Sequence, residues 1–68
     1  MTSDPIDAAT KAHYLSLARA VLRARDEGRV DQAAESRCRL LAAVVERQGR
    51  EWAEGVVRHY LVLAGTEE

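Results

Sequence analysis

The stretch from Trp52 to Ala64 most constrains the fold, because the helix that it would form is apolar on nearly every side. At helical spacing its residues fall on two adjacent lines, one with Trp52, Val56, His59 and Leu63 and the other with Ala53, Val57, Tyr60 and Ala64. Leu61 and Val62 reach the remaining sides. If only one side faced a core, the rest would stay in water at a cost of roughly 25 cal/mol per Å². The stretch therefore predicts a helix covered from more than one direction, unless Leu61 and Val62 are scattered surface residues near a chain end.

The chain has 68 residues, which corresponds to one small domain. A chain of this length buries only about 60% of the surface that its unfolded form exposes, so its stability is marginal. Such domains usually gain support from disulfides, a metal, close helix packing or another chain. Cys38 is the only cysteine, which excludes an intrachain disulfide, and His13 and His59 have no metal-ligand spacing. We therefore expect no metal and no cofactor, and support from packing or oligomerisation.

The charge balance argues against two classes of partner. Ten basic and eleven acidic side chains give a net charge of −1, which provides no long-range attraction to nucleic acid or to an anionic membrane. No apolar run approaches the roughly 18 residues of a membrane span. The start of the chain, Met1 to Pro5, has neither the basic residues nor the apolar run of a signal peptide. With its unpaired thiol, the sequence predicts a cytoplasmic protein without membrane contact.

The first helix has clear start and stop signals. After a tail at residues 1–3, Asp4 offers a cap and Pro5 suits the first helical position. An apolar face follows at helical spacing through Tyr14, Leu17, Ala18, Val21 and Ala24. Gly28 suits the left-handed residue that ends a helix, and Asp31 suits the cap of the next one. The sequence therefore predicts a helix over about residues 5–27 and a turn at 28–31.

Two architectures are compatible with the rest of the chain. The apolar line through Leu41, Val45 and Gln48 continues to Trp52 without an offset, which favours one helix over about residues 32–64. A glycine such as Gly49 costs a helix only about 1 kcal/mol relative to alanine. The predicted fold is therefore all-α, a single domain over residues 4–65 with an acidic tail at 66–68, in which a hairpin with a long second helix pairs into a dimeric four-helix bundle. The alternative is a three-helix bundle broken at Gly49, for which dimerisation is optional.

No residue pattern indicates an enzyme. Cys38 falls on the apolar line of the second helix, where a free cysteine is more often an inert core thiol than a nucleophile. His59 lies on the apolar stripe of the last helix. It is expected to be a partly buried histidine, or alternatively a pH-sensitive group at a subunit contact.

The predicted function is a small helical protein–protein interaction module, either a homo-oligomeric adaptor or a regulatory subunit that docks by helix packing. Its partner would be a second copy, in a homodimer, or a helix of another protein. Aromatic side chains with polar tips dominate interface hot spots, which makes Trp52 and Tyr60 the expected anchors. The whole expected contact surface is Trp52, Val56, Val57, Tyr60, Leu61 and Leu63.

A small dimeric DNA-binding transcriptional regulator is the alternative. Its phosphate contacts would come from the arginines of the second helix, Arg37, Arg39, Arg47 and Arg50. Acidic side chains such as Asp31 and Glu35 are interspersed with these arginines and would face the phosphates. The sequence therefore favours a solvated surface of mixed charge at this place.

Overall fold

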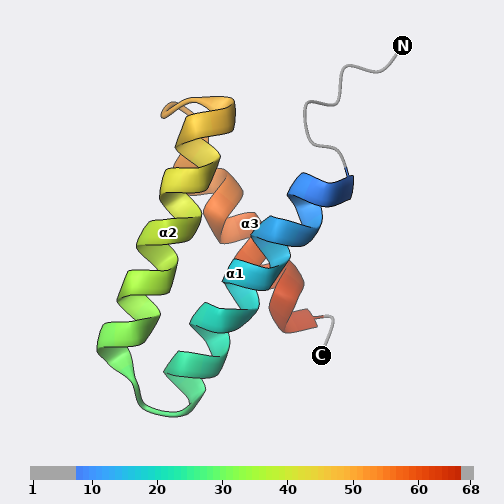
Figure 1. Cartoon of the computed structure of the whole chain (residues 1–68). Coiled ribbons are helices and arrows are strands. Elements are labelled where there is room, and N and C mark those ends of the chain that lie inside the picture. Colours follow the sequence, from blue (N-terminus) through green and yellow to red (C-terminus); the bar gives the residue numbers. More distant parts are fainter. Residues whose placement is uncertain (1–7, 67–68) are drawn as a thin grey trace.

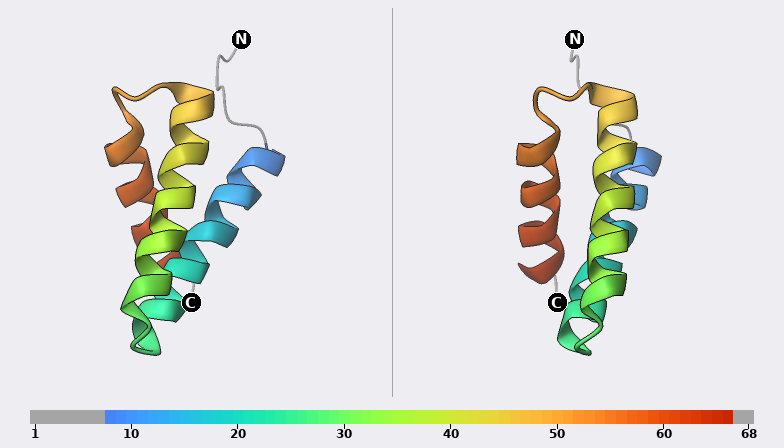
Figure 2. Two further views of the ribbon diagram at one scale, coloured as in Figure 1. Left: turned by 60° about the vertical axis from the view of Figure 1, so that its left-hand side comes forward. Right: turned by 90° about the vertical axis from the view of Figure 1, so that its left-hand side faces the viewer.

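The computed structural model describes residues 8–66, which form α1 (Ala8–Asp26), α2 (Val30–Gln48) and α3 (Ala53–Thr66). α1 and α2 make an antiparallel hairpin, and α3 crosses it diagonally from the end of α2 toward the C-terminal part of α1 (Figure 1). Figure 2 shows that α3 lies on one side of the hairpin, with the other side left open. The described residues confirm the all-α class. The predicted tail at 1–3, the start signal at Asp4 and Pro5, and residues 67–68 of the acidic tail lie outside them.

The first turn is closed by two backbone hydrogen bonds around Gly28. The amide of Arg29 donates to the carbonyl of Ala24 at 2.8 Å, and the amide of Gly28 donates to that of Arg25 at 3.1 Å. This pair of bonds is the Schellman motif, and Gly28 has the positive φ of 78° that the motif requires. The predicted role of Gly28 is confirmed.

The start of α2 differs from the prediction. Arg29 occupies the cap position and makes no capping bond with its side chain, so the expected cap at Asp31 is wrong. Asp31 lies instead in the first turn of the helix, where its negative charge meets the positive end of the helix dipole.

The preference for one long second helix is also wrong, because α2 ends at Gln48. Gly49 has φ 91° and ψ 166°, a backbone region that is essentially restricted to glycine. The turn that follows reverses the chain, and α3 starts at Ala53 without a capping Ser, Thr, Asp or Asn. The three-helix alternative therefore describes the fold of the single chain. α3 also runs two residues further than expected, since Thr66 is helical and its hydroxyl donates to the carbonyl of Val62 at 2.7 Å.

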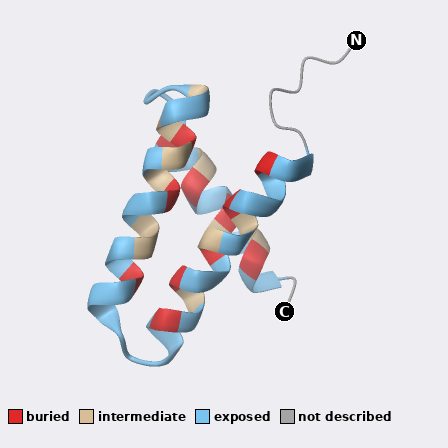
Figure 3. Ribbon diagram, in the orientation of Figure 1, coloured by how far each residue is buried: buried red, intermediate tan, exposed pale blue. Residues whose placement is uncertain are grey.

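The reversed α3 fills a core that all three helices share (Figure 3). The main buried cluster consists of Tyr14, Ala18, Leu40, Val44, Ala53, Val57, Tyr60 and Ala64, and a smaller one of Val21, Ala24 and Ala33. The rings of Tyr14 and Tyr60 meet edge to face, with centroids 5.3 Å apart. In α1 the buried face agrees with the prediction. In α2 it is rotated by one residue, about 100°, because Leu40 and Val44 are buried whereas Leu41 and Val45 are half-buried.

Small side chains dominate this core. Alanines come from all three helices, and Leu40 is the one leucine among the buried residues that the structure describes. The other leucines are half-buried at the rim, where they pack against the clusters: Leu15, Leu17, Leu22, Leu41, Leu61 and Leu63. The chain therefore leaves part of its larger apolar side chains in contact with solvent.

Candidate interaction surface on the third helix

The face of α3 that points away from the hairpin is the candidate site. We call it the outer stripe and define it as Trp52, Gly55, Val56, His59, Val62 and Leu63. Trp52, in the turn just before the helix, is 68% exposed, and Val62 is 65% exposed. Gly55 and His59 are exposed as well, and Val56 and Leu63 are half-buried at the edge of the stripe. Alternating steps of three and four residues are typical of the seam along which two helices pack.

Of the charged side chains of α3, Glu54 lies off this stripe, whereas the exposed Arg58 borders it, three residues after Gly55 and four before Val62. Arg37 of α2 donates a hydrogen bond to the carboxylate of Glu54 at 3.0 Å, and this ion pair joins the two helices on the polar side of α3. An exposed pair of this kind contributes at most about 1 kcal/mol. The six residues of the outer stripe include no Asp, Glu, Lys or Arg, whereas Arg58 beside them is charged and exposed.

A shallow apolar groove lies at the start of the outer stripe. It is lined by Trp52, Gly55, Val56, His59 and Tyr60. The imidazole of His59 stands edge-on to the ring of Tyr60 at a centroid distance of 5.3 Å. His59 is exposed, so the expectation of a partly buried histidine is wrong, and its pH-sensitive role stays a prediction.

The structure divides the predicted contact residues into two groups. Trp52, Val56 and Leu63 lie on the outer stripe, as expected. Val57 and Tyr60 are buried in the core of the single chain, and Leu61 is half-buried against both clusters, so these three do not form part of an exposed contact surface. Because nearly every side of this helix is apolar, periodicity does not show which side faces its own chain.

The predicted contact set lacked three residues of the stripe, Gly55, His59 and Val62, of which Val62 is the large apolar one. Its signal was present in the sequence, since Val62 continues the seam from Trp52 through Gly55 and His59. It was obscured by the long-helix prediction, which counted Tyr60 and Leu61 among the uncovered residues.

Tyr14 places a polar group inside the core. Its side chain is fully buried, and its hydroxyl has no hydrogen-bond partner among the described residues. Burial raises the pKa of the Tyr14 phenol, and the nearby Arg47 guanidinium partly offsets this shift. A buried hydroxyl without a partner destabilises the folded state by about 1–3 kcal/mol.

Tyr14→Phe is therefore expected to stabilise the protein by about 1 kcal/mol at neutral pH. In the wild type, the folded state favours the neutral phenol. The stability that this preference contributes is complete below the unfolded pKa of about 10, and it is lost as pH rises through the higher folded pKa. The variant should lack this alkaline loss. Urea unfolding at pH 7 and pH 11 measures both effects, and a variant less stable than the wild type at pH 7 would show that the hydroxyl is bonded.

Cys38 is exposed on α2, which corrects its assignment to the core. The rotation of the buried face by one residue accounts for the error, because Cys38 belongs to the line of Leu41 and Val45 and lies toward its solvent side. The described residues contain no group of three or more His, Cys, Asp or Glu that could hold a metal ion.

The arginines proposed for nucleic-acid binding do not gather on one face. Arg37 and Arg39 are two residues apart and so point about 200° apart around α2. Each is paired, Arg37 with Glu54 and Arg39 with Glu35 at 3.1 Å. Arg47 lies in the last turn of α2 and Arg50 in the turn after it. These residues provide no continuous basic surface.

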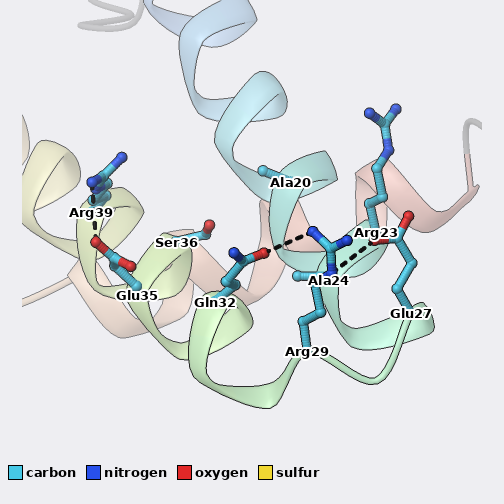
Figure 4. A pocket seen from close by; sticks show the side chains of 9 residues that line it. All are labelled: Ala20, Arg23, Ala24, Glu27, Arg29, Gln32, Glu35, Ser36 and Arg39. Carbon is cyan, nitrogen blue, oxygen red and sulfur yellow. Dashed lines mark hydrogen bonds and ion pairs between the residues drawn. The ribbon is translucent and has the colours of Figure 1, made fainter.

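Alternating charges also line the open side of the hairpin (Figure 4). There Arg29 pairs with Glu27 at 3.5 Å and donates to the side chain of Gln32 at 3.3 Å, beside the pair of Arg39 and Glu35. Such a surface offers neither an anion nor a cation a single-sign site.

Within residues 8–66, no helix is both long enough and apolar enough to cross a membrane. The chain matches no protein-family model, no curated protein and no solved structure.

Proposed function

We propose that this protein is a small helical interaction module that associates with a second copy of itself through the outer stripe of α3, and that it acts by binding and not by catalysis. The observation that carries the proposal is the exposure of two large apolar side chains, Trp52 and Val62, along one side of α3. We place the module in a reducing cytoplasm, where the exposed thiol of Cys38 would remain unoxidised.

The distribution of exposed apolar side chains supports this surface over others. In the described part of the chain, the large exposed apolar residues are Val30, Trp52 and Val62. Val30 stands alone at the hairpin turn, whereas Trp52 and Val62 belong to the same stripe and are joined there by the half-buried Val56 and Leu63. Contiguous apolar patches are uncommon on monomers and typical of interaction sites.

The small size of the core favours the burial of further apolar surface by association. With alanine at many core positions and most leucines at the rim, the single chain has a modest hydrophobic gain on folding. Covering the outer stripe would remove more apolar surface from water, in the way that small domains commonly gain stability from association. The seam-like spacing of the stripe suits a helix as its partner.

The experiment is sedimentation equilibrium of the wild type over a wide concentration range. One helix face is a small interface, so we expect a dimer with a Kd of about 1–100 µM. Trp52 is the only tryptophan, and it lies in the proposed contact. Its emission should therefore move to shorter wavelengths as the dimer forms. A folded monomer with solvated tryptophan emission at millimolar concentration would contradict the proposed function.

A further inference from the structure

The turn between α2 and α3 depends on the conformation of Gly49. The turn comprises residues 49–52, and Gly49 has φ 91° and ψ 166° there. This backbone region is essentially restricted to glycine, whereas a Cβ at the position would meet nothing within 4 Å. The backbone angle, and not crowding by a neighbour, therefore requires glycine at this place.

The other three residues of the turn do little to hold it. Arg50, Glu51 and Trp52 are exposed, and their side chains make no hydrogen bond or ion pair with the described residues. Inside the turn, the amide of Ala53 donates to the carbonyl of Arg50 at a long 3.3 Å. All three residues are compatible with a helix, in which their amides would bond to the carbonyls four residues earlier. Apart from the glycine, the reversed turn therefore depends on the docking of α3.

The docking of α3 does not require that α3 and the hairpin belong to the same chain. The buried face of α3 consists of Ala53, Val57, Tyr60 and Ala64. It packs in the main cluster against residues of both α1 and α2, and Glu54 beside it pairs with Arg37 of α2 at 3.0 Å. The α3 helix of a second copy can make the same contacts if its own turn is open. No new surface and no unpaired charge is then buried.

We propose that the turn at residues 49–52 is a hinge at which two copies of the chain exchange α3. In the exchanged dimer, α2 and α3 of each copy form one continuous helix, and each α3 docks on the hairpin of the other copy. Ala53 of such a helix lies nine residues after Val44 and so points about 180° away from it. The docking face of α3 is then out of reach of its own hairpin, whereas the hairpin of a second copy can cover it. The exchange is reciprocal, so the assembly closes as a two-fold dimer.

This inference goes beyond the proposed function, because it uses the buried face of α3 and not the outer stripe. Val62 lies near the end of α3 that is far from the hinge, and it keeps in the exchanged dimer the exposure that it has in the single chain. A charge at Val62 therefore leaves the exchange unaffected. The two modes of association can be measured separately in this way.

Gly49→Ala is the first test, made together with Val62→Asp so that association through the stripe does not contribute. Alanine disfavours the φ of 91° in the turn and favours the continuous helix, and the exchanged dimer contains two such positions. After refolding from urea, we expect the Kd for dimerisation to be at least about 100-fold lower than that of Val62→Asp alone. Sedimentation equilibrium measures both values. Gly65→Ala in the same background is the matched control, a helical glycine outside the turn, and should leave the Kd unchanged.

The second test identifies which chain supplies each α3, and it uses the ion pair of Arg37 and Glu54. Arg37→Glu and Glu54→Arg are introduced separately into the protein that carries Gly49→Ala and Val62→Asp. An exchanged dimer of either variant alone has like charges at both contacts, whereas a mixed exchanged dimer has opposite charges at both. When the two variants are refolded together, we expect roughly three-quarters or more of the dimers to be mixed, against about half for random pairing. Native mass spectrometry measures this fraction.

The outcomes separate the exchange from the proposed function. A protein with Gly49→Ala that stays monomeric, whether folded or destabilised, contradicts the hinge, because the continuous helix was available to it. Dimers that mix at random contradict the exchange, because α3 then remains on its own hairpin. Neither result affects the outer stripe. The failure of the proposed function appears instead in the wild type, as association that Val62→Asp does not weaken or as no association at all.

Discussion

Replacing Val62 with aspartate is expected to weaken self-association by at least about 100-fold and to leave the three-helix fold intact. Val62 is 65% exposed in the single chain, so a carboxylate there stays solvated in the monomer. In the dimer each copy would have to desolvate the new carboxylate, which costs several kcal/mol per site even with the exposed Arg58 four residues earlier on the same chain. Sedimentation equilibrium measures the loss of association, and far-UV circular dichroism verifies the fold.

Val30→Asp is the matched control. Val30 is 74% exposed at the start of α2, outside the outer stripe, and undergoes the same chemical change. It should associate like the wild type. Equal weakening by both substitutions would point to a general effect of charge and not to the stripe, and unfolding by Val62→Asp would show that Val62 belongs to the core.

Leu40→Ala should destabilise the fold by about 2–4 kcal/mol, the largest stability effect that we expect from truncating a leucine of this chain. Leu40 is fully buried in the main cluster, and the neighbouring core positions hold mainly alanine and valine, which fill little of the resulting cavity. A chain of this size has a total stability of roughly 3–10 kcal/mol. The substitution therefore removes a large share of it, and urea unfolding should show a much lower midpoint.

Leu41→Ala is the matched control for this prediction. Leu41 is half-buried, so its truncation should cost clearly less than that of Leu40. The two proteins must be compared at equal concentration, because association raises apparent stability by mass action. A greater cost at Leu41 would mean that the face through Leu41 and Val45, which the sequence favours, is the true core face of α2.

This comparison illustrates how much of the fold the sequence could predict. The all-α class, the buried face of α1 and the turn at Gly28 follow from local patterns, because only one side of α1 is continuously apolar and glycine is the residue that adopts a positive φ without strain. In α2, Leu40 and Leu41 lie side by side, so two adjacent faces are both apolar. Which of them is buried depends on where α3 lies, and that is a tertiary property.

The break at Gly49 depends on tertiary structure in the same way. A glycine in this position is compatible with a continuous helix and with a turn, because its intrinsic cost in a helix is small. Reversing the chain buries Ala53, Val57 and Tyr60 against the hairpin, and that gain decides between the two. The helical spacing of apolar residues that continues from Val45 to Trp52 therefore did not indicate a continuous helix.

The candidate site was predictable in part for a related reason. Trp52, Val56 and Leu63 could be identified because the last helix has more apolar circumference than one chain covers. Tyr60 and Val57 could not be separated from them, since both lines of the helix are apolar and only the docked hairpin distinguishes inside from outside. Gly55 was not identified from the sequence, because a glycine adds no side chain to the apolar pattern.

The edge-to-face pair of Tyr14 and Tyr60 has a practical consequence for all of these measurements. Both rings are fixed in the core at 5.3 Å and 72° to each other, whereas the single indole of Trp52 stands at the surface. Because the two tyrosine rings have asymmetric surroundings, their near-ultraviolet circular dichroism reports on the order of the core. The fluorescence emission of the Trp52 indole reports on association through the outer stripe. The two signals, recorded on one sample, can therefore distinguish a disordered core from a dissociated dimer.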